Sequence, residues 1–229
     1  MLFTCDRLRC FEHYHSAMGL RAWILGGMAA QLGRPTGLRG RLVGGMLNRS
    51  NGGFIAAAID ALDLKAGEVA ADLGFGGGVG LGLLLERVGP NGQVHGVDFS
   101  PTMVSLAESR YRSDVARGRL HLHTGSITKL PLEDGSINGA ITINTIYFIA
   151  DLDRAFAELA RVVAPSGRVV VGIGDPQMMA RIPTTPFGFT IRPADEVVAL
   201  AKTAGLILQD HKRAGQGEEA AHLLVFAQS

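Results

Sequence analysis

The chain has 229 residues and is 47% hydrophobic, enough for the core of one sizeable α/β domain, which excludes an intrinsically disordered protein. Its net charge of +1 gives no general attraction to nucleic acid or to an anionic membrane surface. The two cysteines, Cys5 and Cys10, exclude a disulfide framework, and charges among the first ten residues argue against a secretory leader, so we expect a cytoplasmic protein.

Residues 1–62 differ in pattern from the rest of the chain and are predicted to form a helical N-terminal cap or lid. Apolar side chains between Trp23 and Leu32 offer one face of a helix. The apolar stretch from Ala22 to Leu32 is too short to span a bilayer, so we expect no stable membrane insertion. The second predicted region covers residues 63–229.

From residue 65 onward, strand and helix patterns alternate, as in a doubly wound sheet. The first predicted strand is Val69–Leu73, followed by a helix that ends near Val88. A second strand ends at Asp98, after which Ser100 suits a helix N-cap and Pro101 the first helical turn.

The second half of the chain continues the alternation. We expect a helix that begins after Asp151, ended by Pro165-Ser166-Gly167, and a helix that stops at Gly205. The segment 174–192 has no clear period, yet it is rich in apolar side chains. The remaining predicted strands are 119–123, 137–143, 168–173, 206–210 and 222–227.

A glycine-rich stretch, VAADLGFGGGVGLG, follows the first strand at residues 69–82. The dinucleotide fingerprint G-x-G-x-x-G/A fails in every register, because its last position falls on Val79 or on a leucine. The phosphate-binding Gly-Lys-Ser/Thr pattern is also missing from this stretch. These two results argue against a nicotinamide-dependent oxidoreductase, which we keep as an alternative.

Two carboxylates point to a cationic nucleoside as the ligand. Asp72, at the end of the first strand, would repel a pyrophosphate but attract an ammonium or a sulfonium. Asp98, at the end of the second strand, can accept both hydroxyls of a ribose. Gly74 and Gly76 let the chain turn sharply and keep Cβ atoms out of the path of the ligand.

Several ordered motifs over about residues 42–172 resemble the class I S-adenosylmethionine-dependent methyltransferases, particularly their UbiE/COQ5-like small-molecule branch. The motifs are ADLGFGGG, HGVDFSPTM, LPLEDGSINGAIT, NTIYFI and ELARVVAPSGRVVV. The resemblance implies a Rossmann-like, mostly parallel seven-stranded sheet with an antiparallel last strand. It also implies S-adenosyl-L-methionine as cofactor and a small-molecule methyl acceptor, with no nucleic-acid partner.

The same resemblance implies roles for individual residues. Asp72 and the glycines would hold the methionine part of the cofactor, and Asp98 would hold the ribose. Asn144 would line the floor of the site beneath the sulfonium. Gly125-Ser126-Ile127 stands where the family commonly has Gly-Asp or Gly-Asn, so a serine hydroxyl or backbone groups would contact the adenine. The full set implied to bind cofactor is Asp72, Gly74, Gly76, Gly78, Asp98, Phe99, Met103, Ser126, Ile127 and Asn144.

On the acceptor side, Tyr147 and Phe187 are predicted to contact substrate, although Tyr147 can equally be a core aromatic with its hydroxyl satisfied. The apolar residues of the cap and of 174–192 favour an acceptor with substantial hydrophobic surface. No general base is assigned, and a homodimer stays open. A non-catalytic S-adenosylmethionine-binding protein is a further alternative.

The group formed by Cys5, Cys10, His13 and His15 has an irregular spacing for a zinc site. Solvated side chains are the favoured interpretation there, and no metal is predicted.

Overall fold

The computed structural model describes residues 52–214 and 221–228. Residues 1–51 of the predicted cap therefore lie outside the described residues, including Trp23 and the cysteine and histidine side chains between Cys5 and His15.

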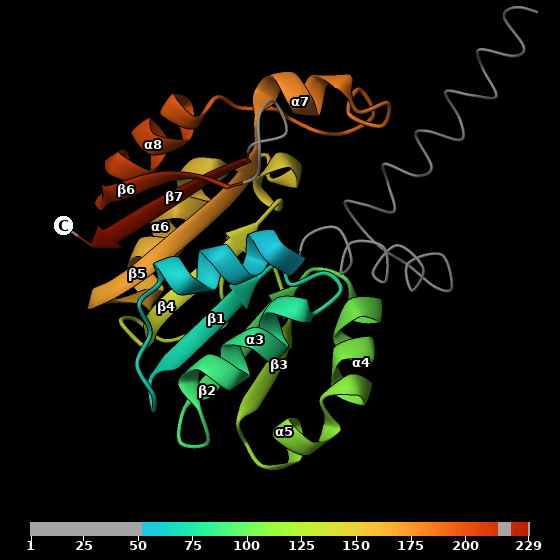
Figure 1. Cartoon of the computed structure of the whole chain (residues 1–229), viewed down its shortest axis with the longest axis vertical. Helices are drawn as coiled ribbons and strands as arrows, with labels where there is room; N and C mark the ends of the chain where they lie inside the picture. The colour runs from blue at the N-terminus through green and yellow to red at the C-terminus, as the bar shows by residue number, and fades with distance from the viewer. Residues whose placement is uncertain (1–51, 215–220, 229) are drawn as a thin grey trace, which may run out of the picture.

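The core of the fold is a seven-stranded sheet with the order β3-β2-β1-β4-β5-β7-β6 (Figure 1). Neighbours among β1 to β5 pair in parallel, whereas β7 is antiparallel to both β5 and β6. The expected mostly parallel sheet with an antiparallel last strand is confirmed. The strands are β1 Val69–Leu73, β2 Gln93–Asp98, β3 Leu120–Thr124, β4 Ile137–Ile143, β5 Val163–Gly174, β6 Leu206–Ala214 and β7 Ala221–Gln228.

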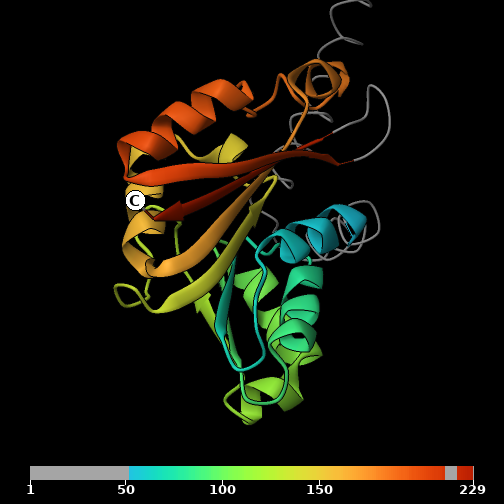
Figure 2. The same cartoon turned by 60° about the vertical axis from the view of Figure 1, so that its left-hand side comes forward.

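Helices cover both faces of the sheet (Figure 2). Leucines and valines of α3, together with the helix of residues 52–61 and α4, pack on one face, and α6 and α8 pack on the other. The helices are α3 Val79–Val88, α4 Pro101–Arg110, α5 Arg112–Ala116, η1 Ile146–Phe148, α6 Leu152–Val162, α7 Pro176–Arg181 and α8 Ala194–Thr203.

Local capping explains where two of these helices begin. Ser100 accepts a hydrogen bond from the backbone of Met103 and Pro101 opens α4, as predicted. Asp151 accepts from the backbone N–H of Arg154 at 3.0 Å and starts α6. Both helices follow strands that end at the same edge of the sheet, so the caps fix the loops at that edge.

The structure differs from the sequence-based prediction around β5 and α7. Pro165-Ser166-Gly167 was expected to precede a strand, but β5 already begins at Val163. The pairing with β4 jumps from Ile137↔Val163 to Gly139↔Arg168, so the turn residues form an irregularity inside the strand. Helix α7 was not predicted, although Asp175-Pro176 is the same cap-and-proline signal as Ser100-Pro101.

The helix of residues 52–61 contributes to the same core as the sheet. Ala58 and Ile59 are buried in a cluster with Ala70, Val170 and Leu223. The proposed boundary at residue 62 stays a prediction, because residues 1–51 lie outside the described part of the chain.

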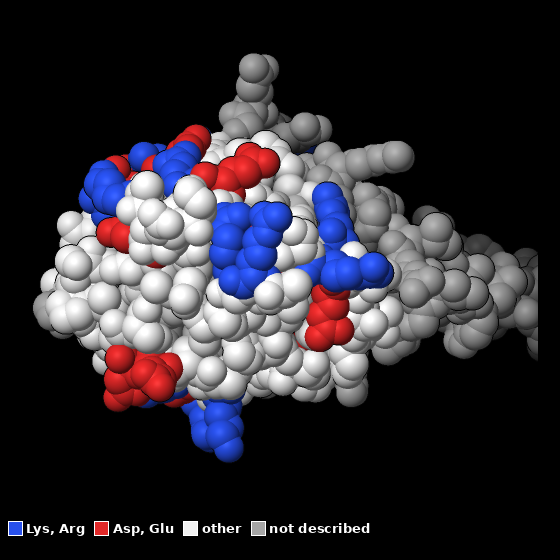
Figure 3. All heavy atoms as spheres, turned by 90° about the horizontal axis from the view of Figure 1, so that it is seen from below, with Lys and Arg blue, Asp and Glu red and all other residues white. Residues whose placement is uncertain are grey.

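Charges of both signs share the face shown in Figure 3, between wide areas formed by other residue types. Within the described ranges, none of the helices has the length and hydropathy needed to cross a membrane.

Candidate functional site

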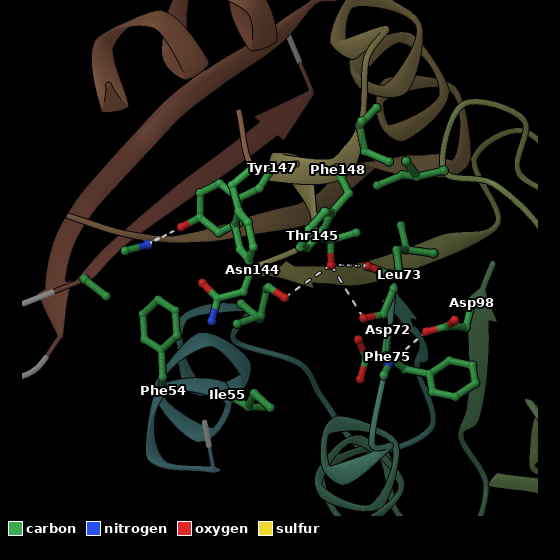
Figure 4. A pocket seen from close by; sticks show the side chains of 18 of the residues that line it. Phe54, Ile55, Asp72, Leu73, Phe75, Asp98, Asn144, Thr145, Tyr147 and Phe148 are labelled. Carbon is green, nitrogen blue, oxygen red and sulfur yellow. Dashed lines mark hydrogen bonds between the residues drawn. The ribbon is translucent and has the colours of Figure 1, made fainter. Parts of the chain in front are cut away.

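A cavity of about 1230 Å³ opens at the carboxyl ends of β1, β2, β4 and β5 (Figure 4). Ligands bind at this edge in doubly wound sheets. The cavity brings together nine of the residues singled out in the sequence. These are Asp72, Gly74, Gly76, Asp98, Phe99, Ser126, Ile127, Asn144 and Tyr147.

Asp98 joins the glycine loop to the loop after β2. Its Oδ2 accepts from the Gly76 N–H at 2.8 Å, and its Oδ1 accepts from the Ser100 N–H at 2.8 Å. Burial raises the pKa of the carboxyl group, and these two hydrogen bonds oppose that rise. A carboxylate has about four acceptor positions, and the described residues use two of them here, which leaves capacity for ligand hydroxyls.

Asp72 is a buried carboxyl group on the wall of the same cavity, with 4% of its surface exposed. Burial, and secondarily the charge of Asp98, raises its pKa to about 8. Its environment therefore penalises the negative charge when the cavity holds no cation. A ligand ammonium or sulfonium nearby would favour the ionised form.

The glycine run makes room for protein side chains as well as for a ligand. A Cβ on Gly74 would lie 2.5 Å from the Thr145 side chain, and one on Gly80 would overlap the Asp72 carboxylate. Gly76 and Gly78 adopt φ values of 50° and 77°, which favour glycine. Gly78 ends the loop as the N-cap of α3 and does not line the cavity.

Gly74→Ala should destabilise the fold by about 2–4 kcal/mol, since it combines a clash with Thr145 and backbone strain at φ +82°. Urea unfolding measures the loss. Gly67→Ala is the matched control, because Gly67 has φ +89° with nothing within 4 Å of its Cβ position. That variant should cost only about 1 kcal/mol. Equal losses in the two variants would show that Thr145 imposes no constraint.

The adenine end of the predicted site lies between β2 and β3. Phe99 lies on the cavity wall with 53% of its surface exposed, and an exposed aromatic ring can stack on a base. The Ser126 hydroxyl is 2.8 Å from that of Thr128 and also accepts from the Thr128 N–H. Met103 belongs to the set implied to bind the cofactor, but it is 1% exposed in the core and does not line the cavity. The α4 turn that starts at Ser100 carries its side chain inward.

Asn144 lies in the middle of the cavity, directly after β4. It has a left-handed φ of 56°, which asparagine tolerates better than most residues, and its N–H donates to Gly172 O at 2.8 Å. This conformation ends β4 and places Asn144 on the cavity wall between the two carboxylates and the aromatic residues beyond (Figure 4).

The far half of the cavity is apolar. Phe148 and Phe189 have ring centroids 4.6 Å apart, and Tyr147 lies 5.9 Å from Phe189. The Tyr147 hydroxyl accepts from the Gly174 N–H at 2.5 Å, and burial raises its pKa to about 12. This oxygen therefore has a structural partner in the backbone of Gly174.

Phe187 does not reach the cavity, whereas Phe189 lines it. Successive turns explain the difference, since the Phe187 N–H bonds to Thr184 O and the Phe189 N–H to Thr185 O. The second turn carries Phe189 against Tyr147.

The sequence-based set missed several lining residues. Phe148 lies beside Tyr147 in the motif NTIYFI. The sequence of this motif does not show which of the two aromatic side chains points into the cavity. Phe54 and Ile55 come from the helix of residues 52–61, and Lys212 lines the cavity because β6 extends beyond its predicted end. In the described ranges, no group of three or more His, Cys, Asp or Glu side chains is arranged to hold a metal ion.

Comparison with known proteins finds similarity to methyltransferases over part of this chain. Residues 71–171 match a family described as a methyltransferase domain. A demethylmenaquinone methyltransferase of Lactobacillus johnsonii is 36% identical over 112 residues, 47% of this chain and 44% of that protein. An uncharacterized 37.1 kDa protein of a Streptomyces fradiae transposon is 44% identical over 122 residues, 53% of this chain and 34% of that protein. The chain thus spans less than half the length of these curated relatives.

A solved structure supports the fold. Geranyl diphosphate C-methyltransferase from Streptomyces coelicolor superposes with a TM-score of 0.68, covering 80% of this chain and 81% of that chain at 16% identity. At this identity the likeness shows the architecture alone.

Proposed function

We propose that this protein transfers a methyl group from S-adenosylmethionine to a small, partly hydrophobic molecule, since residues 71–171 match a methyltransferase domain. The observation that carries the proposal is the pair of buried carboxylates, Asp72 and Asp98, on neighbouring parallel strands at one cavity. This pair favours a ligand with a cationic end and a ribose, and disfavours a pyrophosphate.

The residues present fit S-adenosylmethionine. In our proposal Asp72 attracts the ammonium group, Asp98 accepts from the ribose hydroxyls, and Phe99 covers the adenine beside Ser126 and Ile127. When bound, the cofactor supplies a methyl group that is already activated by its sulfonium. The protein has to align the acceptor and exclude water, and such alignment can account for much of a rate enhancement.

The apolar half of the cavity supports a hydrophobic acceptor. Phe54, Phe148, Phe189, Met178 and Met179 line it, and burying apolar ligand surface against such side chains is favourable. The acceptors named for the compared proteins, demethylmenaquinone and geranyl diphosphate, both carry large apolar parts. We extend only that shared property to this chain.

Methyl transfer can be measured with methyl-labelled S-adenosylmethionine and a panel of demethylmenaquinol, geranyl diphosphate and glycine. We expect label on an acceptor with apolar surface and none on glycine. Tight S-adenosylmethionine binding without transfer across a broad apolar panel would favour a non-catalytic binding protein. Binding of NAD in place of S-adenosylmethionine would favour the oxidoreductase alternative.

The proposal also includes a role for residues 1–62. They would act as a cap over the acceptor half of the cavity, and Phe54 and Ile55 already line that half.

The low cysteine content supports a reducing, cytoplasmic location. The net charge of +1 and the mixture of charges on the face shown in Figure 3 support a small-molecule partner over a nucleic acid.

A further inference from the structure

Tyr111 connects the junction of α4 and α5 to the glycine-rich loop. Its hydroxyl donates a hydrogen bond to the backbone oxygen of Gly78 at 2.7 Å, although the two residues are 33 positions apart. The Arg110 guanidinium lies 5.3 Å from the centre of the tyrosine ring. The half-buried ring is thus tied to the last residue of the loop.

The first turns of α3 are shaped to accept this ring. A Cβ on Gly82 would lie 2.9 Å from the Tyr111 hydroxyl oxygen, and one on Gly78 would lie 3.6 Å from the ring carbon Cε2. Gly78 has the left-handed conformation φ 77°, ψ 15°. Its carbonyl direction is set by this conformation, and the tyrosine hydroxyl is positioned to hold it.

Asp72 contacts α3 from another direction. Its carboxylate lies against Gly80, so a Cβ there would overlap it. The start of α3 is therefore fixed by Tyr111 at Gly78 and Gly82, and by Asp72 at Gly80. Gly76 and Gly77, which line the cavity, directly precede the fixed turn.

We propose that Tyr111 is a positioning residue for cofactor binding: its hydrogen bond to Gly78 holds the glycine loop in the conformation that receives S-adenosylmethionine. Tyr111 does not line the cavity, so it acts through the loop. The inference rests on the proposed function. The positioning role of Tyr111 also explains why residue 82 is a glycine. Gly82 lies within α3 and does not line the cavity, but a Cβ there would come close to the Tyr111 hydroxyl.

Tyr111→Phe removes the hydroxyl and keeps the ring. We expect the affinity for S-adenosylmethionine, measured by calorimetry, to fall about 3- to 10-fold, the range for loss of one hydrogen bond. Amide hydrogen exchange of residues 74–79 in the ligand-free protein should become faster. Ser109→Ala is the matched control, since it removes a hydroxyl-to-carbonyl bond within α4 that is remote from the loop. It should change neither quantity.

Gly82→Ala gives a second test, because the new methyl group would displace the Tyr111 hydroxyl from Gly78. Alanine favours the helix by about as much free energy as the lost hydrogen bond contributes, so the urea midpoint should change little while the cofactor binds about 3- to 10-fold more weakly. In the Tyr111→Phe background the remaining ring atoms would lie 3.5 Å or more from the added Cβ. There, Gly82→Ala should have almost no further effect on affinity.

The outcomes separate this inference from the proposed function. If the wild type fails to bind S-adenosylmethionine, the proposed function falls, and the exchange rates of residues 74–79 still test Tyr111. If Tyr111→Phe binds as tightly as the wild type and its loop exchanges at the wild-type rate, the positioning role is overturned. Additive losses of affinity in the double variant would also contradict it.

Discussion

Asp98→Ala is expected to weaken S-adenosylmethionine binding by at least about 100-fold while the protein stays folded. Each hydrogen bond to a charged group contributes roughly 1.5–3 kcal/mol, and two ribose hydroxyls would lose their acceptor together. The loop would be affected as well, because the Gly76 and Ser100 N–H groups both donate to this carboxylate. Calorimetry measures the affinity, and circular dichroism verifies the fold.

Asp98→Asn helps to separate the two contributions. Its amide oxygen can still accept one of the loop hydrogen bonds, whereas its amide nitrogen cannot accept a second. We expect an affinity between those of the wild type and of Asp98→Ala. Unchanged affinity in Asp98→Ala would remove this residue from the binding site.

Binding of S-adenosylmethionine should release about one proton at pH 7, because the cofactor ammonium would ionise Asp72. The pKa of this carboxyl is raised from 3.8 to about 8 by burial and by the charge of Asp98, so it is mostly protonated in the ligand-free protein. Affinity should consequently rise with pH up to about 8 and level off above. Calorimetry in buffers with different ionisation enthalpies counts the protons directly.

The same carboxyl should make the ligand-free protein less stable in mild alkali. Its folded pKa lies above the unfolded value, so its contribution to stability is lost as the pH rises from about 4 to about 8. Asp72→Asn should therefore raise the urea midpoint at pH 9 more than at pH 5, and should abolish proton release. A variant that still released one proton on binding would show that another group titrates.

The sequence predicted the parts of the fold that depend on local signals. The strand Ile137–Ile143 was predicted from a segment rich in isoleucine, and the structure has the same bounds. The caps at Ser100 and Asp151 follow from side chains that satisfy the first backbone N–H groups of a helix. These features need no knowledge of distant contacts.

The sequence did not predict the features that depend on tertiary contacts. Met103 is the last residue of the motif HGVDFSPTM, but its buried position is decided by how α4 packs on β2 and β3. Phe187 and Phe189 have the same chemistry and differ only through the turns that precede them. The reason for Gly82 lies with Tyr111, a residue 29 positions away that no local pattern relates to the glycine run.

In our proposal the cavity binds S-adenosylmethionine through Asp72 and Asp98. Calorimetric titration of the full chain with S-adenosylmethionine, and separately with NAD, tests it most directly. We predict saturable binding of S-adenosylmethionine with a Kd between about 1 μM and 1 mM, the usual range of enzyme saturation constants, and no measurable binding of NAD. Binding of NAD with no heat from S-adenosylmethionine would contradict the account.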